Sequence, residues 1–270
     1  MNAIDFQYDD LYLSDFGYMI CTFDSGNSPE TISMGSEITF TQSPVSNGRR
    51  FMITSASYES CIEAEFSICK DPEYFIDYED RFFTIEEQQE LMRWLNRTEM
   101  CKFAPVEDDR IDIFYEGSFN LSKIELNGDV IGMSLHFISN RPFGFGTDIT
   151  HDFSVLPGAN TYIIRDASDE IGYTYPSVKI KINVSGDLTI TNNFDGRQTI
   201  IKNCVNGETI TMKNMIIESS DSNHQKTIMN DFNFLFPRIC NSYDKVDNKF
   251  EFSLSCDVEM VYQPIRKVGI

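Results

Sequence analysis

The 270-residue sequence contains no apolar run that approaches the roughly 18 residues that a membrane-spanning helix needs. Its N-terminus lacks the basic region followed by an apolar stretch that is typical of a secretory signal peptide. The seven cysteines form no CxxC pair, and their odd number argues against a disulfide framework and against a zinc site. We therefore expect a folded protein, of one large domain or two small ones, that does not insert into a membrane.

Positive charge is also scarce. Lys and Arg total 22 against 42 Asp and Glu, which gives a formal net charge of −20. Such a surface repels phosphate groups, so duplex DNA is an improbable ligand. Residues 1–145 hold 26 acidic and 10 basic residues (net −16), whereas residues 146–270 hold 16 and 12 (net −4). The uneven charge indicates two different surfaces and favours two domains, although a single solvated acidic face would also explain it.

Signatures of catalytic and cofactor sites are missing. The sequence has no GxSxG elbow, HExxH pair, P-loop or EF-hand loop. Of its three histidines, His136 falls on a predicted strand, on the face opposite its apolar neighbours. His151 adjoins Asp152, but no further ligand follows at metal-binding spacing. His224 lies in the polar run SSDSNHQK, which is typical of a solvated loop. We predict no catalytic, cofactor or metal site, and we assign no binding residues.

Two groups of acidic residues, at 77–80 and 107–109, could in principle act in acid–base catalysis. Neighbouring acids on a loop are usually only solvated, and we favour that interpretation. Gly144-Phe145-Gly146 is half of a GxGxxG dinucleotide-binding motif. It lacks the third glycine and the helix that follows such a loop, so we predict a linker there. A chain of this length without a catalytic constellation is more often a structural or binding protein, and we predict that it is not an enzyme.

One helix is strongly indicated, over residues 84–96. Thr84 is a good N-cap, and Glu87 three residues later completes a capping box. The apolar residues Leu91, Trp94 and Leu95 share one face at helical spacing, so the helix is expected to cover a sheet with that single stripe. Trp94, the only tryptophan, could serve as a ligand platform, but a core position is the better interpretation.

The other elements read as strands. Residues 121–126 and 129–137 alternate on either side of Asn127–Gly128, which predicts a hairpin with a two-residue type I′ turn. The pattern breaks at residues 140–148, where we place a boundary between domains at 1–146 and 147–270.

The second half consists almost entirely of short alternating segments. Val178, Ile180, Ile182 and Val184 point one way from residue 177 onward. Residues 198–205 and 208–212 predict a second hairpin. Regular short strands of this kind predict a β-sandwich, and the whole chain is predicted to be mainly β, a β-rich α+β fold.

The order of these elements resembles the distal tail proteins of long-tailed bacteriophages, which belong to the wider phage tail-component family. The resemblance covers the chain from about residue 45 to its end. It rests on the helix in FTIEEQQELMRWLNR, on KFAPVEDDRIDIFYEGSFNLSKIEL and GMSLHFISNRPFGFG, and in the second half on GYTYPSVKIKINVSGDLTITNN, VNGETITM, FNFLFPRI and FEFSLSCDVEMVYQP.

The resemblance implies an N-terminal belt domain, made of strands and one helix, and a C-terminal galectin-like β-sandwich. In the family, the belts of six copies close into a ring beneath the tail tube, and the tail-tip and receptor-binding proteins attach to it. We therefore expect a homohexameric hub in the virion tail, assembled in the bacterial cytoplasm, with the belt carrying the main self-contacts. Part of the acidity of residues 1–145 would line the lumen and repel passing DNA.

Three alternatives stay open. The second half could be a carbohydrate-binding module that recognises host cell-wall polysaccharide, with Tyr162, Tyr173 and Tyr175 as the aromatic residues able to stack on a sugar. A glycosidase acting on the host envelope is a weaker alternative. The same ring could also serve a defective prophage or a tail-like bacteriocin.

Overall fold

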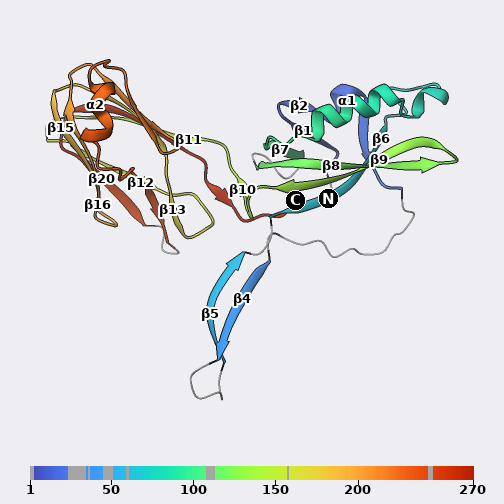
Figure 1. Cartoon of the computed structure of the whole chain (residues 1–270), viewed down its shortest axis with the longest axis horizontal. Helices are drawn as coiled ribbons and strands as arrows, with labels where there is room; N and C mark the ends of the chain where they lie inside the picture. The colour runs from blue at the N-terminus through green and yellow to red at the C-terminus, as the bar shows by residue number, and fades with distance from the viewer. Residues whose placement is uncertain are drawn as a thin grey trace. The chain divides into compact units, whose positions relative to one another are not determined.

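The computed structural model describes residues 3–23, 35, 37–44, 51–58, 61–107, 113–156, 158–242 and 246–270 (Figure 1). The chain forms two compact units, which we call the first unit (residues 1–145 and 266–270) and the second unit (residues 146–265). Strands dominate both units, so the predicted β-rich α+β fold is confirmed.

Seven strands of the first unit form one antiparallel sheet, whose two outermost strands are close neighbours in the chain. The short 3-10 helix η1 (Leu13–Phe16) and Gly17 connect them. A connection of this length spans at most about 20 Å, so the sheet must curl until its edges approach each other. The curl encloses an apolar core. The strand order is β2 (Leu11–Tyr12), β1 (Asp5–Tyr8), β7 (Cys101–Val106), β8 (Tyr115–Leu126), β9 (Asp129–Ser139), β6 (Glu63–Lys70) and β3 (Tyr18–Cys21).

Helix α1 (Ile85–Leu95) lies along one side of this sheet (Figure 1). The predicted capping box is present: Thr84 Oγ1 accepts a hydrogen bond from the Glu87 backbone N–H (3.2 Å), and Glu87 Oε2 accepts one from the Thr84 N–H (2.8 Å). The helix buries the predicted stripe against the core, and the prediction of this helix is confirmed. Its buried residues are Gln88, Leu91, Trp94 and Leu95.

Trp94 occupies the core, as predicted. Only 6% of the residue is exposed, and its ring centroid lies 4.6 Å from that of Phe16. Its indole Nε1–H donates a hydrogen bond to the Tyr8 carbonyl oxygen (3.0 Å), which satisfies the one polar atom of the ring.

The predicted hairpin at Asn127–Gly128 is also confirmed. Strands β8 and β9 pair along almost their whole length up to this turn. Asn127 and Gly128 have φ values of +55° and +99°, so both adopt the positive φ that a type I′ turn requires.

The half-motif at residues 144–146 is not simply a linker. Gly144–Phe145 forms the short strand β10, and Phe145 is buried in the first unit. Its backbone N–H and C=O both pair with the backbone of Phe114 (2.8 and 2.9 Å). The linker prediction missed this strand because its pairing partner, Phe114, lies far earlier in the chain, and residues 144–146 themselves give no sign of it.

The second unit is a sandwich of two antiparallel sheets with one shared core, as predicted. Five strands form one sheet: β11 (Ile149–Val155), β21 (Cys256–Tyr262), β14 (Ser177–Ile182), β17 (Thr209–Lys213) and β18 (Ile216–Ser219). Four strands form the other: β12 (Thr161–Arg165), β20 (Asp247–Phe252), β15 (Gly186–Asn192) and β16 (Arg197–Cys204). The remaining elements are β13 (Gly172–Thr174) paired with β19 (Ile239–Asn241), helix α2 (His224–Asp231), and β22 (Ile265–Arg266), at which the second unit ends.

The predicted inward row of β14 holds only in part. Val178, Ile180 and Ile182 are buried, whereas Val184 is 52% exposed. The strand ends at Ile182, so the alternation of β structure does not extend to residue 184.

The prediction of a second hairpin, over residues 198–212, was wrong. Both strands exist, but β16 pairs with β15, whereas β17 pairs with β14 and β18. The connection at Asn206–Gly207 therefore crosses from one sheet to the other. Each strand buries its apolar alternate residues toward the shared core, and this pattern is the same for a hairpin and for two facing strands.

Candidate functional site

A buried lysine organises the segment that follows β6. We call residues 71–83 the anchored loop. The side chain of Lys70 is 3% exposed, and its Nζ pairs with Glu87 Oε1 (2.6 Å) and donates to the Asp80 carbonyl oxygen (2.8 Å). The same ammonium lies 4.5 Å from the ring centroid of Phe75, close enough for a cation–π contact. One buried side chain thus joins α1 to residues 75 and 80 of the loop.

Backbone contacts hold the loop further. The Arg81 guanidinium donates to the carbonyl oxygens of Phe75 (3.3 Å) and Ile76 (3.4 Å). At the start of the loop, the Asp71 N–H donates to the Gly17 carbonyl oxygen (3.0 Å). The loop contains only the short 3-10 helix η2 (Glu79–Arg81), but these bonds fix its course.

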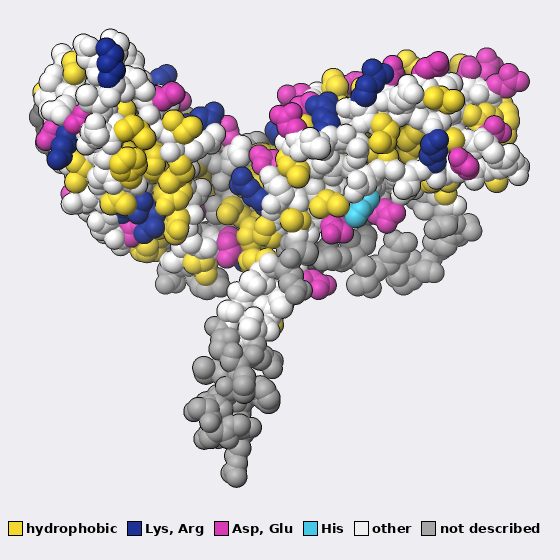
Figure 2. Space-filling view, viewed as in Figure 1, with side chains coloured by type: hydrophobic (Ala, Val, Ile, Leu, Met, Phe, Trp, Pro, Cys, Tyr) yellow, Lys and Arg dark blue, Asp and Glu magenta, His cyan; other side chains and the backbone are white. Residues whose placement is uncertain are grey.

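The anchored loop presents large apolar side chains to solvent. Tyr74, Ile76 and Tyr78 are 68%, 78% and 72% exposed. Exposed apolar groups on a fixed backbone are typical of a protein-binding surface. Acidic side chains gather with apolar ones over the part of the first unit that carries α1 (Figure 2). The acidic residues of the loop alternate with the apolar ones and are exposed, as predicted for residues 77–80: Glu73, Asp77, Glu79 and Asp80. Of the second acidic group, residues 108 and 109 lie outside the described residues.

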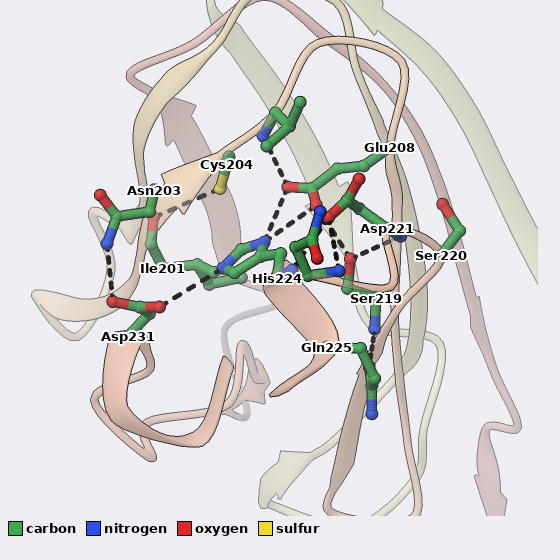
Figure 3. Close-up of polar contacts among 12 residues, drawn as sticks. Ile201, Asn203, Cys204, Glu208, Ser219, Ser220, Asp221, His224, Gln225 and Asp231 are labelled. Atoms are coloured by element: carbon green, nitrogen blue, oxygen red, sulfur yellow. Dashed lines mark hydrogen bonds and ion pairs between the residues drawn. The ribbon is translucent and has the colours of Figure 1, made fainter. Parts of the chain in front are cut away.

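The second unit contains a buried polar cluster centred on His224 (Figure 3). The prediction of a solvated loop was wrong here, because His224 is the first residue of α2 and is 4% exposed. Its Nδ1 lies 2.8 Å from Glu208 Oε2, and its Nε2 lies 3.8 Å from Asp231 Oδ2. The Glu208 side chain is 1% exposed. The sequence SSDSNHQK is polar, but the partner acid lies 16 residues earlier, so its local pattern carried no sign of burial.

The geometry of this cluster indicates a structural role. Glu208 also accepts hydrogen bonds from the Val205 N–H (2.9 Å) and from Ser219 Oγ (2.8 Å), so its carboxylate ties the loop before β17, strand β18 and helix α2 together. A Ser–His–acid catalytic site needs a hydroxyl on the histidine nitrogen that faces away from the acid. Here that nitrogen, Nε2, faces a second carboxylate, that of Asp231, and not a hydroxyl group.

Of the other two histidines, His136 lies on the strand face that the alternation predicts, while the strand that carries His151 is not among the predicted elements. His136 is half exposed on β9 and lies 3.1 Å from Glu63 Oε2. His151 points inward from β11, where burial lowers its pKa against the opposing effect of Asp152. Asp152 points to the outer face, so the two neighbours cannot share a ligand. Among the described residues, no three His, Cys, Asp or Glu side chains group as metal ligands.

The three tyrosines proposed for sugar stacking have different positions. Tyr162 is half buried, with its ring stacked on Phe153 (3.9 Å between centroids), and it is not available. Tyr173 and Tyr175 are 57% and 38% exposed, and their rings meet edge to face at 5.5 Å. The structure thus brings two of the three together on the surface.

An arginine and an aspartate fix this tyrosine pair. The Arg238 guanidinium lies 4.4 Å from the ring centroid of Tyr173, and its Nε pairs with Asp195 Oδ2 (2.6 Å). Burial alone would raise the pKa of Asp195, but hydrogen bonds from the Arg197 backbone and from Arg238 hold it below its ordinary value. No sequence pattern linked residues 173, 195 and 238.

The seven cysteines are free thiols. Four are buried, as predicted for small core residues, namely Cys101, Cys204, Cys240 and Cys256. Cys21, Cys61 and Cys69 are half buried. No helix in the described part of the chain is both long and apolar enough to cross a membrane.

Comparison with known proteins identifies the family. Residues 1–141 match the family described as phage tail protein N-terminal domain, and residues 143–262 match the one described as phage tail C-terminal domain. The crystal structure of SPP1 Dit, described as a paradigm of the hub adsorption apparatus in phages that infect Gram-positive bacteria, shares the fold. It aligns with a TM-score of 0.65 and 14% identity, over 96% of this chain and 98% of that one. The comparison with curated proteins gave no match. The chain belongs to this family of phage tail proteins.

Proposed function

We propose that this phage tail structural protein is the distal tail hub. Six copies form a ring that joins the tail tube protein to the tail-tip protein and to receptor-binding proteins. The observation that carries the proposal is the alignment with SPP1 Dit, which spans both units and nearly the whole of both chains. The protein would assemble in the host cytoplasm and remain in the virion tail. The second unit would be its galectin-like domain.

The acidity of the first unit supports a lumen that DNA can pass through. Six copies of residues 1–145, at −16 each, carry a formal charge of −96. Such a wall would repel phosphates instead of binding them. A ring whose inner surface proved neutral or basic in a cryo-electron microscopy map would contradict this part of the proposal.

Negative-stain electron microscopy with mass photometry tests the ring directly. We expect six-fold rings with a central hole from the full chain, either alone or co-expressed with the tail tube and tail-tip proteins of the same phage. A chain that stays monomeric under both conditions would contradict the hub proposal.

The self-contacts are assigned to the first unit, so a chain without the second unit should still form the ring. Residues 266–270 must be kept in that variant. Tyr115 Oη donates to the carbonyl oxygens of Val268 (3.0 Å) and Gly269 (3.2 Å), and Ile270 is buried in the first unit. A glycine–serine linker should therefore replace residues 146–265. If this variant folds but stays monomeric where the full chain assembles, the assignment is wrong.

A second candidate function is sugar binding by the second unit, and the exposed Tyr173–Tyr175 pair favours it. Aromatic rings held in place beside arginine and aspartate are suited to stacking and hydrogen bonding with a saccharide. Binding to purified host cell-wall polysaccharide should fall at least about tenfold in a Tyr173→Ala/Tyr175→Ala variant and stay unchanged in Ile163→Ala, which alters another exposed apolar residue (51% exposed). No binding by the unaltered chain would dismiss this function.

A further inference from the structure

Strands β4 (Ile38–Pro44) and β5 (Phe51–Tyr58) form a sheet of their own in the first unit. They pair with each other, and no third strand joins them among the residues that the structure describes. A lone two-stranded hairpin is marginally stable in water unless a further surface covers it. We call this element the β4–β5 hairpin.

The β4–β5 hairpin has one apolar face. Ile38 pairs with Tyr58 and Phe40 with Ala56, so these four side chains share a face. At its base, the Tyr58 ring packs on Phe143 (4.7 Å between centroids). Ile38, opposite Tyr58, and Phe40, farther along the hairpin, are 49% and 54% exposed. The alternate positions on the opposite face are polar, and those described are Thr39, Thr41, Ser55 and Ser57.

The charge of the hairpin differs from that of the rest of the first unit. The described strands of the hairpin, residues 38–44 and 51–58, contain no charged residue. Residues 71–90, which include the anchored loop and most of α1, contain eight acidic residues and one basic residue, a net of −7. In a chain with a net charge of −20, most pairs of surfaces repel each other between copies, whereas the uncharged strands of the hairpin can approach the acidic loop without this repulsion.

We propose that the apolar face of the β4–β5 hairpin of one copy docks on the anchored loop of a second copy. The proposal rests on the proposed ring and names the contact that closes it. Each partner exposes large apolar side chains, Ile38 and Phe40 on the hairpin and Tyr74, Ile76 and Tyr78 on the loop. The Lys70 anchor holds the loop in shape before binding, which reduces the entropy cost of association. Two different surfaces of one chain make a head-to-tail contact, the kind that generates rings.

Photo-crosslinking tests the contact independently of ring formation. The full chain would carry p-benzoylphenylalanine in place of Phe40, and equal amounts of unlabelled and ¹⁵N-labelled protein would be mixed before irradiation. We expect crosslinks to residues 71–85 that join labelled to unlabelled chains. Placing the same group at Leu126, which is 58% exposed in the same unit, should give no crosslink to that segment. Crosslinks confined to one chain or to other segments, or no crosslink at all, would overturn the proposal.

A pair of variants separates the contact from folding. Ile76→Ser/Tyr78→Ser should weaken self-association at least tenfold in mass photometry without changing the thermal melting curve, because both side chains lie in solvent. Ile163→Ser should leave self-association unchanged. Unchanged self-association in Ile76→Ser/Tyr78→Ser would refute the docking site.

The two proposals fail in different ways. Rings in electron micrographs with crosslinks outside residues 71–85 would leave the hub function standing and remove this contact. Crosslinks to residues 71–85 in open oligomers, with no ring even beside the tail tube and tail-tip proteins, would keep the contact and remove the hexameric hub.

Discussion

Replacing Trp94 by alanine is expected to lower the free energy of unfolding of the first unit by about 3–5 kcal/mol. The indole is buried, packs on Phe16, and stacks nearly parallel to Phe6 with centroids 5.9 Å apart. The substitution leaves a large cavity between α1 and the sheet and removes the donor to the Tyr8 carbonyl oxygen. Urea denaturation followed by circular dichroism measures the change, since the variant has no tryptophan fluorescence.

Two control variants show whether the loss of stability is specific to the buried indole. Met92→Ala alters the same helix at a side chain that is 43% exposed, and it should change stability by less than about 0.5 kcal/mol. Trp94→Phe keeps most of the apolar volume and should fold even if the alanine variant does not. A Trp94→Ala protein as stable as the Met92→Ala protein would mean that Trp94 does not anchor this core.

Replacing Glu208 by alanine should cost the second unit a similar amount, about 3–5 kcal/mol, because it removes a buried carboxylate that accepts several hydrogen bonds, and each buried donor left unsatisfied costs about 1–3 kcal/mol. The change leaves three donors without their acceptor: the Val205 N–H, Ser219 Oγ and His224 Nδ1. Buried donors without a partner keep their full desolvation cost. Denaturant unfolding gives the magnitude, with Glu218→Ala on the exposed face of β18 as the matched control.

A double-mutant cycle shows whether the pair acts as a unit. Glu208→Ala/His224→Phe should be less destabilised than the sum of its two single variants by at least about 1 kcal/mol, because the second change removes a donor that the first left unpaired. Strict additivity, or a Glu208→Ala variant as stable as Glu218→Ala, would show that the cluster does not hold α2 in place.

The elements predicted best are those whose signals are local. The capping box at Thr84 and Glu87 needs only residues three positions apart, and the Asn127–Gly128 turn needs only two adjacent residues. The row Val178, Ile180 and Ile182 follows from the two-residue period of a strand with one buried face. In each case the chemistry that selects the conformation lies within one turn or one strand of the sequence.

The larger errors share one cause, which is that the deciding partner lies far along the chain. The polar surroundings of His224 in the sequence predicted solvent, but Glu208 reaches it from the segment before β17. Residues 198–212 have the alternation of a hairpin, and only the pairing with β15 and β14 shows that the two strands belong to different sheets. Residues 266–270 return to the first unit because Tyr115 and the core accept them there, and nothing in those five residues indicates this.

The candidate binding surfaces also depend partly on local sequence and partly on contacts between distant segments. The amino-acid sequence is enough to show that the chain is acidic, β-rich and without recognisable catalytic motifs. Net charge is a sum over residues, and hydrophobic periods and motifs are patterns of neighbouring residues. The tertiary structure decided which apolar residues stay exposed. No sequence pattern shows whether Tyr74, Ile76 and Tyr78 are buried. They face solvent because Lys70, Glu87 and the Arg81 contacts hold the anchored loop in that conformation. Exposure depends on what packs against a residue, and that is a property of contacts between distant segments.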